Sequence, residues 1–596
     1  MNSIPELKVA SLREAFLSRS CTPTDLVRAV YAAIEKDAEV AKIWISRLPL
    51  DDLLAYAQTI EQRAAESGIE SMPLYGVPFG IKDNIDLAGL PTTAACPDFS
   101  YEPKQHAFVV QELIDAGAIP LGKTNLDQFA TGLVGVRSPY GVPGNSFDPE
   151  FLPGGSSSGS AISVARKQVC FALGTDTAGS GRVPASFNNL VGVKPSLGIL
   201  GSSGLVPACR TLDCISIFAG NTADARAVFE VAAAYDDNDA YARPMNAPSP
   251  AINPTAFRFG VPRNRDLEFF GNDSARKVFF EAVKKLEAQG GVRVEIDFQP
   301  FLAAARLLYE GPWVAERYVA IEAILKERPE ILHPVTRRII EGGGEPSAAD
   351  AFKARYRLAD RKREADKVWN DVDFVVTPTA GTIYRIAEVE ADPITLNSNL
   401  GYYTNFMNLL DYSALALPAG FMEGFGGMPF GITLFAPAMR DFDLLEIGAH
   451  FCGESKPTDD AISAPKDWLE IAVCGAHMEG LPLNYQLTES GGRLLRAAKT
   501  TAYYEMYLLP EVEGLPPRPG MIRQASGREI DLEVWALPPK AFGSFVAQIP
   551  SPLGIGKIEL ADGGSVPGFT CESYALESAR DISTFGGWRE FLKEGN

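Results

Sequence analysis

The sequence predicts an α/β protein in which a mixed central sheet is covered by helices, followed by a small β-rich α+β domain. Two observations lead to this prediction. Residues 75–201 alternate short apolar runs, interrupted by Gly and Pro, with amphipathic helical stretches. A polar segment with two prolines, 454–466, then precedes a tail with frequent Gly and Pro turns. We therefore expect domains at 1–453 and 467–596, joined by a linker at 454–466.

Helices and strands are assigned along the chain from the hydrophobic period and from capping residues. Residues 5–66 read as helices: Thr24-Asp25 is the expected cap of one helix, and Asp51-Asp52 begins another. The remaining elements of the large domain are expected as helices at 107–116, 159–167, 274–288, 301–327 and 348–369, and as strands at 257–262, 292–297 and 374–376.

The most apolar stretch, residues 412–439, is interrupted by Glu423, by three prolines and by several glycines. A bilayer-spanning helix does not readily carry these residues, so we expect buried strands and turns instead. In the tail, short strands are expected at 469–474, 528–536 and 544–549. These strands make the predicted C-terminal domain β-rich.

Composition and charge narrow the range of functions. The chain has 596 residues, 46% of them hydrophobic, which is typical of a folded globular protein. Lys and Arg number 55 against 75 Asp and Glu, a formal net charge of -20, which disfavours nucleic acid or an anionic membrane as a partner. Eight cysteines occur without a C-x-x-C pair, so neither a zinc site nor a disulfide framework is predicted. The N-terminus has no signal or transit pattern, and we expect a cytoplasmic protein.

Two neighbouring segments have the composition of a reactive loop. Residues 153–161 read Pro-Gly-Gly-Ser-Ser-Ser-Gly-Ser-Ala, and residues 174–185 read Gly-Thr-Asp-Thr-Ala-Gly-Ser-Gly-Arg-Val-Pro-Ala. Glycine clusters let backbone N–H groups approach a ligand closely, and successive N–H groups in a turn suit an oxyanion or a phosphate. A tight Gly/Ser turn without function is the alternative for either segment alone.

The base that would activate a serine here is predicted to be a lysine. The sequence has no Gly-x-x-x-x-Gly-Lys-[Ser/Thr] phosphate loop and no Gly-x-Ser-x-Gly elbow, and none of its four histidines has a motif-like context. A desolvated lysine loses its proton near neutral pH and can then accept one from serine. Lys82 meets this need because it ends an apolar, strand-like run, residues 76–82; a solvated strand end is the alternative.

Lys82 and the two serine-bearing segments together resemble the amidase signature family. The family's Gly-Gly-Ser-Ser loop, Asp-Thr-x-Gly-Ser-x-Arg segment and upstream lysine occur here in order, and the spacing of Ser156 and Ser180 matches its pattern. The resemblance implies the amidase signature fold. It also implies that Ser180 attacks an amide carbonyl, while Ser156, held by a cis peptide bond, relays the proton to Lys82. The implied oxyanion hole consists of the backbone N–H groups of Thr177, Ala178, Gly179 and Ser180.

Further segments resemble a branch of that family, the allophanate hydrolases. These segments are Asn125 to Gly132, Val136 to Gly141, Ala178 and Gly181, Thr211 to Cys214, Tyr403 to Asp411, and the C-terminal extension. Allophanate is a urea that carries an N-carboxylate, so its hydrolase must hold an anion beside the scissile amide. A guanidinium with a phenol hydroxyl suits that task. The resemblance assigns it to Tyr309 and Arg317, with a backbone contact from Gly132; alone, Arg317 among Glu residues would read as a surface ion pair.

The implied reaction is the hydrolysis of allophanate to ammonia and carbon dioxide in urea degradation, with no cofactor and no metal. The expected partners are the small substrate, a separate urea carboxylase that supplies it, and a second copy of the chain in a homodimer. Three other interpretations stay open: a general amidase of the same fold acting on biuret or aliphatic amides, the glutaminase component of a tRNA amidotransferase, and a non-catalytic amide-binding scaffold.

The predicted C-terminal domain begins with a loop, residues 473–484, that resembles the opening loop of the γ-glutamylcyclotransferase-like fold. In that fold a Gly-rich turn lines a small anion pocket. Residues 536–550 contain no Glu or Asp where the family's catalytic glutamate should follow, so cyclotransferase activity is not expected. His477 is the candidate for handling the carboxylated intermediate of the implied reaction. A structural histidine in a purely structural domain is the alternative.

Overall fold

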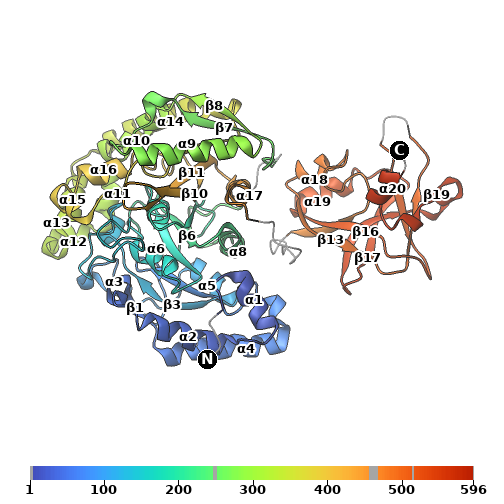
Figure 1. The fold of residues 1–596 in the computed structure, drawn as a ribbon, viewed down its shortest axis with the longest axis horizontal. Helices are drawn as coiled ribbons and strands as arrows, with labels where there is room; N and C mark the ends of the chain where they lie inside the picture. Colours follow the sequence, from blue (N-terminus) through green and yellow to red (C-terminus); the bar gives the residue numbers. More distant parts are fainter. Residues whose placement is uncertain (1–4, 246–250, 455–467, 513–515, 595–596) are drawn as a thin grey trace. The chain divides into compact units, whose positions relative to one another are not determined.

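The computed structural model describes residues 5–245, 251–454, 468–512 and 516–594 (Figure 1). Its internal contacts divide the chain into two compact units. Unit 1 is Met1–Met245 with Asn253–Glu454, and unit 2 is Asn246–Ile252 with Ser455–Asn596. Residues 455–466 of the predicted linker lie outside the described residues. Within the described residues, no helix is both long and apolar enough to cross a bilayer.

Unit 1 is built on one mixed sheet, which confirms the predicted fold class. Strand β2 is parallel to both of its neighbours, β3 and β4, whereas the later hairpin β10–β11 is antiparallel. The strand order across the sheet is β1 (Trp44–Arg47), β3 (Ile119–Thr124), β2 (Pro78–Lys82), β4 (Phe171–Asp176), β6 (Cys214–Ala219), β5 (Val191–Lys194), β10 (Tyr412–Met422), β11 (Met428–Pro437), β9 (Phe374–Pro378), β7 (Phe257–Pro262), β8 (Gly291–Ile296).

The apolar stretch 412–439, predicted as buried strands and turns, forms the long β10–β11 hairpin. Most side chains of both strands are buried, because neighbouring strands and packed helices enclose them. Gly424, Gly426 and Gly427 connect the strands at φ +77°, +67° and +66°, values that only glycine adopts at no steric cost. The glycines that argued against a membrane span therefore make the turn.

Helices cover the sheet, and α6 lies against β2, β3, β4 and β6 while α9 and α17 lie against β10 and β11 (Figure 1). The helices of unit 1 are α1 (Val9–Leu17), α2 (Pro23–Ile34), α3 (Val40–Ile43), α4 (Leu50–Ser67), α5 (Phe108–Asp115), α6 (Ser158–Ala165), α7 (Val183–Phe187), α8 (Thr222–Ala232), α9 (Asp273–Ala288), α10 (Gln299–Glu310), α11 (Trp313–Ala320), α12 (Glu322–Glu327), α13 (Pro334–Ile340), α14 (Ala348–Ala365), α15 (Ile386–Ala391), α16 (Thr395–Leu400) and α17 (Asp441–Cys452).

Two details of the predicted N-terminal helical region are wrong. The cap of α2 is Thr22 rather than Thr24, because Pro23 occupies the first helical position and the Thr22 hydroxyl accepts from the Asp25 N–H at 3.1 Å. Residues 44–47 form strand β1 instead of helix. Trp44 is buried there beside β3, and its indole N–H donates to Gln168 at 2.7 Å, so long-range packing overrides the local helical pattern.

Unit 2 contains a five-stranded sheet and a three-stranded sheet, which confirms its β-rich character. The sheet orders are β13 (Arg493–Lys499), β16 (Asp531–Leu537), β12 (Leu469–Val473), β18 (Ser565–Cys571), β17 (Leu553–Glu559), and β15 (Pro519–Arg523), β14 (Tyr504–Leu508), β19 (Arg580–Asp581). Its helices are α18 (Tyr485–Thr488), α19 (Pro539–Val546) and α20 (Trp588–Glu594). The strand predicted at 544–549 is wrong, because Phe542 and Phe545 recur at helical spacing and pack on the core from α19.

An aromatic cluster between α10 and the β10–β11 hairpin should contribute strongly to the free energy of unfolding of unit 1. Phe435 is fully buried, with ring centroids 5.3 Å from Phe406 and 5.7 Å from Phe301. Phe435→Ala should lower the free energy of unfolding by about 3–5 kcal/mol, because the cavity cannot collapse between a strand and packed rings. Phe352→Ala, at a ring that is 55% exposed on α14, is the control and should change it by about 0.5 kcal/mol or less. Equal losses in urea denaturation would contradict this picture of the core.

Candidate active site

Lys82 and Ser156 meet at the carboxyl ends of parallel strands, where open α/β sheets form their clefts. Lys82 is the last residue of β2, and its side chain is fully buried. The Lys82 Nζ donates to Ser156 Oγ at 2.7 Å and to Thr175 Oγ1, from β4, at 2.7 Å. The Gly155–Ser156 peptide bond is cis, and α6 begins two residues later. The structure therefore brings these two predicted residues into direct contact.

The environment of Lys82 favours its neutral form. Burial lowers the pKa of Lys82 to about 7, and the carboxylates of Asp127, Asp213 and Asp176 oppose that shift without cancelling it. Both hydrogen-bond partners of the amine are hydroxyl groups rather than carboxylates. A lysine of this kind can take a proton from a serine hydroxyl near neutral pH.

A buried ion pair shapes the loop that carries Ser180. Asp176, at the end of β4, accepts from Arg182 Nε at 2.8 Å and from Arg182 Nη2 at 2.9 Å, and neither side chain is exposed. Burial alone would raise the pKa of Asp176, but Arg182 holds it below its ordinary value. The same carboxylate accepts the backbone N–H groups of Gly179 and Gly181 at 2.8 and 3.0 Å. The loop is thus folded around one carboxylate.

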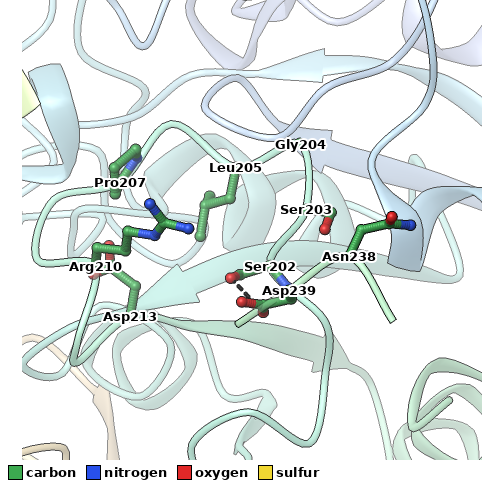
Figure 2. A pocket seen from close by; sticks show the side chains of 9 residues that line it. All are labelled: Ser202, Ser203, Gly204, Leu205, Pro207, Arg210, Asp213, Asn238 and Asp239. Atoms are coloured by element: carbon green, nitrogen blue, oxygen red, sulfur yellow. Dashed lines mark hydrogen bonds between the residues drawn. The ribbon is translucent and has the colours of Figure 1, made fainter. Parts of the chain in front are cut away.

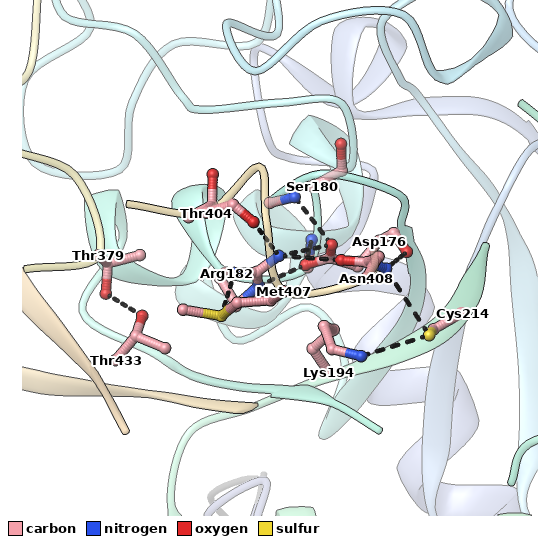
Figure 3. Close-up of polar contacts among 12 residues, drawn as sticks. Asp176, Ser180, Arg182, Lys194, Cys214, Thr379, Thr404, Met407, Asn408 and Thr433 are labelled. Carbon is pink, nitrogen blue, oxygen red and sulfur yellow. Dashed lines mark hydrogen bonds and ion pairs between the residues drawn. The ribbon is translucent and has the colours of Figure 1, made fainter. Parts of the chain in front are cut away.

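The Ser180 hydroxyl lies on the other side of this loop from the ion pair (Figure 3). Its Oγ donates to the Gly132 carbonyl at 3.5 Å, and no hydrogen bond to Ser156 is present in the described chain. The backbone N–H groups of Thr177, Ala178 and Ser180 have no acceptor among the described residues. The Gly179 N–H, expected from the sequence in the same role, is engaged by Asp176 instead. Three of the four expected donors are therefore available.

Asn408, to which the sequence analysis assigns no role, is hydrogen-bonded to the backbone at the start of the Ser180 loop (Figure 3). Its Nδ2 donates to the Asp176 carbonyl at 2.7 Å and to the Leu212 carbonyl at 2.9 Å. Asn408 and Asp176 are 232 residues apart in the chain, so only the folded structure shows this contact. The available sequence signal was the place of Asn408 in the Tyr403–Asp411 segment that carries the family resemblance.

Arg317 is buried close to the Ser180 loop rather than paired at the surface. It projects from α11 on the same face as Trp313, one helical turn away, and is 4% exposed. Its Nη1 donates to Thr131 Oγ1 at 3.1 Å and to the Ala130 carbonyl at 3.4 Å. No carboxylate lies within ion-pair distance of Arg317 in the described chain. This leaves a buried positive charge next to Gly132.

Tyr309, predicted to share the task of Arg317, lies at the end of α10 and is 40% exposed. Burial acts to lower the pKa of Arg317, but Cys209, Tyr309 and two nearby carboxylates together outweigh it, so the net shift is upward. Burial also lowers the pKa of Arg137, a second buried arginine, and there Asp127 and then Tyr309 oppose the shift without cancelling it. The phenol therefore lies near both guanidinium groups, at a solvent-facing edge.

Asp213, another residue without a predicted role of its own, connects the Ser180 loop to a cavity. Its Oδ1 accepts from Thr177 Oγ1 at 2.5 Å, and its Oδ2 accepts the N–H groups of Ala208 and Cys209 at 2.8 and 3.0 Å. Burial raises the pKa of Asp213 to about 6. Asp213 and Arg210 line one end of a cavity of about 220 Å³ (Figure 2). This cavity reaches the carboxylate that positions Thr177.

His477 lies in unit 2, on the loop after β12. Its ring stacks on Phe569 with centroids 5.0 Å apart and meets Phe545 edge-on at 5.2 Å. Its Nε2 is 3.0 Å from Gln486 Oε1, and burial lowers its pKa. The adjoining Glu479 is fixed by Glu533, which accepts the Glu479 N–H at 2.7 Å. Burial thus favours the neutral form of the His477 imidazole, and hydrogen bonds hold both the ring and the loop that carries it.

Comparisons with known proteins match both units. Residues 25–445 match the family described as Amidase, and residues 469–593 match the Allophanate hydrolase C-terminal domain. Urea amidolyase of Saccharomyces cerevisiae is 42% identical over 583 residues, which cover 93% of this chain and 31% of the relative. A glutamyl-tRNA(Gln) amidotransferase component of Chloroflexus aurantiacus is 31% identical over 478 residues, 75% of this chain and 96% of the relative.

Among solved structures, allophanate hydrolase of Kluyveromyces lactis aligns over 100% of both chains at 38% identity, with a TM-score of 0.81. Urea amidolyase of the same yeast aligns over 100% of this chain but 37% of its own. The chain therefore spans about a third of the length of the urea amidolyases it matches.

The geometry around Lys82 predicts the pH dependence of Ser180 reactivity. A fluorophosphonate should label Ser180 at a rate that is constant above pH about 7 and falls about tenfold for each pH unit below it, because protonated Lys82 accepts no proton. Mass spectrometry of the labelled peptide and labelling time courses measure both quantities. The control is Ser158→Ala, which changes a buried serine two residues after Ser156 and should leave the labelling rate unchanged. Labelling that persists in Ser180→Ala would contradict the assignment.

Proposed function

Because this chain belongs to the amidase family, we propose that it is an amidohydrolase that cleaves allophanate, with Lys82, Ser156 and Ser180 as its catalytic residues. The family matches of both units support this proposal, and so does the alignment of the whole chain with the allophanate hydrolase of Kluyveromyces lactis. The observation that carries the choice of substrate is the burial of Arg317 without a carboxylate partner, hydrogen-bonded beside the Gly132 contact of Ser180.

In the first half of the proposed mechanism, the Ser180 hydroxyl turns from the Gly132 carbonyl toward Ser156 and attacks the terminal amide carbon. Ser156 takes the proton of Ser180 and passes its own proton to the neutral Lys82 amine. The negative charge that develops on the carbonyl oxygen lies against the free N–H groups of Thr177, Ala178 and Ser180. A donor of this type contributes about 3 kcal/mol to the transition state.

Collapse of the tetrahedral intermediate breaks the carbon–nitrogen bond, and the proton held by Lys82 returns through Ser156 to the departing nitrogen, which leaves as ammonia. Water then attacks the acyl-enzyme by the same relay in reverse and releases N-carboxycarbamate. The substrate carboxylate is held by Arg317 and Tyr309, with the Gly132 N–H as a further donor. This arrangement accounts for a buried cation in a protein of net charge -20.

Unit 2 is proposed to act on the carboxylated product. N-carboxycarbamate loses one carbon dioxide to give carbamate, which then releases a second carbon dioxide and a second ammonia. His477 presents a neutral imidazole in an aromatic setting, which suits transfer of a proton during that loss. A urea carboxylase as the source of allophanate, and a homodimeric assembly, complete the proposal.

Substrate preference tests the proposed function directly. Wild-type protein should release ammonia rapidly from allophanate and malonamate and slowly from neutral amides of similar size. Arg317→Ala should lower kcat/KM for allophanate about 100-fold, because a charge-assisted contact is lost, and leave the neutral amides almost unchanged. Arg337→Ala, at an exposed arginine paired with Glu341 at 3.2 Å, is the matched control. If the wild type turned over neutral amides as fast as allophanate, the protein would be a general amidase instead.

The role of His477 has a separate readout. His477→Ala should release the first ammonia at the wild-type rate while N-carboxycarbamate accumulates, because the reaction in unit 1 does not involve this ring. With ¹³C-labelled allophanate, NMR follows the substrate, the intermediate and bicarbonate together. Gln486→Ala, which removes the Nε2 partner, should give a weaker effect of the same kind. Wild-type decay of the intermediate in His477→Ala would leave unit 2 a structural role.

A further inference from the structure

The backbone segment Ala130–Gly132 lies between two buried arginines that come from different parts of the chain. Arg317 donates to the Ala130 carbonyl and to the Thr131 hydroxyl. Arg137 donates through Nη1 to the Thr131 carbonyl at 2.9 Å and through Nη2 to the Pro393 carbonyl at 2.7 Å. Both guanidinium groups therefore hold the segment that also accepts the Ser180 hydroxyl.

Arg137 is buried without a matching carboxylate. It is 1% exposed, its Nε has no hydrogen-bond partner, and no ion pair joins it to a carboxylate within the described residues. Asp127 lies nearby, but its carboxylate accepts the backbone N–H groups of Gly135 and of Arg137 itself, both at 2.9 Å. Burying a guanidinium without an ion pair costs folding free energy, so we expect Arg137 to have a role that offsets this cost.

The hydrogen bond from Arg137 fixes the orientation of one peptide plane. In a trans peptide the C=O and the following N–H point to opposite sides. Because the Thr131 carbonyl points to Arg137, the Gly132 N–H points away from Arg137. That buried N–H has no acceptor among the described residues. The Gly132 carbonyl, in turn, lies 3.5 Å from Ser180 Oγ. Arg137 thus sets the direction of a free donor beside the nucleophile.

The backbone conformation of this segment needs such restraint. Phe129 and Ala130 have φ +49° and +52°, which non-glycine residues seldom adopt. Gly132 has φ +153°, and a Cβ there would lie 2.6 Å from Asp127 Oδ2 and 3.1 Å from Arg137 Nη1. The segment is therefore held in an uncommon shape by contacts from several sides, and Arg137 is one of them.

We propose that Arg137 is a positioning residue that determines specificity for an anionic substrate, by aiming the Gly132 N–H at the substrate carboxylate opposite Arg317. The inference rests on the proposed function, since it concerns the same site. Arg137 touches the backbone rather than the substrate, so its effect reaches the reaction through Gly132.

The test compares Arg137→Met, Arg137→Lys and wild type, with Arg226→Met as the control at an arginine paired with Glu230 at 3.0 Å and Glu446 at 2.9 Å. Three quantities are measured for each: kcat and KM for allophanate and for a neutral amide, the rate of Ser180 labelling by a fluorophosphonate, and malonamate binding by calorimetry in a Ser180→Ala background. Malonamate is the probe because it carries the carboxylate and is not turned over by that background.

Arg137→Met should raise the KM for allophanate and the Kd for malonamate about 10- to 100-fold, the range of one lost charge-assisted contact. The neutral amide and the labelling rate should stay within about threefold of wild type, and Arg137→Lys should recover part of the malonamate affinity.

A parallel loss of labelling, neutral-amide turnover and malonamate binding would overturn the inference in favour of a structural role, and so would unchanged malonamate binding. A wild type that does not prefer allophanate would refute the proposed function itself, whatever the Arg137 variants do.

Discussion

The buried ion pair between Asp176 and Arg182 is the interaction on which the rest of the site depends. One carboxylate at the end of β4 organises both the arginine and the N–H groups of Gly179 and Gly181. Because those two N–H groups point inward, the remaining donors of the loop and the Ser180 hydroxyl are left facing the other way. Breaking a buried pair of this kind by removing one partner costs about 3–5 kcal/mol, and the loop would lose its shape with it.

The fold was largely predictable because its signals are local. Gly- and Pro-bounded apolar runs indicated the strands around Lys82, and the interruptions in 412–439 indicated strands and turns, which the structure shows as one hairpin. The wrong predictions each have a long-range or stereochemical cause. Strand β1 forms because Trp44 is buried beside β3. The α2 cap is Thr22 because Pro23 fits the first helical position, where a missing N–H costs no hydrogen bond. At 544–549, a short apolar run fits a helix as well as a strand.

The sequence predicts members for the proposed site but not the contacts between them. Motif spacing indicated Lys82, Ser156 and Ser180, and the structure supplies what no spacing contains: that Thr175 shares the Lys82 amine, and that Asp176 rather than a ligand takes the Gly179 N–H. Arg317 was assigned by resemblance, and its burial explains why an arginine among glutamates is not a surface pair. Arg137 lies within a segment that carries the family resemblance, Val136 to Gly141, but its contacts with Thr131 and Pro393 are visible only in the folded structure.

The positions of the proposed site residues along the chain have an evolutionary consequence. Lys82, Ser156 and Ser180 all come from the early part of the chain, on or next to β2 and β4, whereas Tyr309 and Arg317 come from α10 and α11, after β8. The proposed catalytic residues and two of the proposed substrate contacts are thus encoded in separate stretches of sequence. Under the proposed assignment, mutations in the later helices can change substrate choice while the residues proposed for hydrolysis stay in place. A single inherited scaffold can diverge toward new amides by changing one pair of helices.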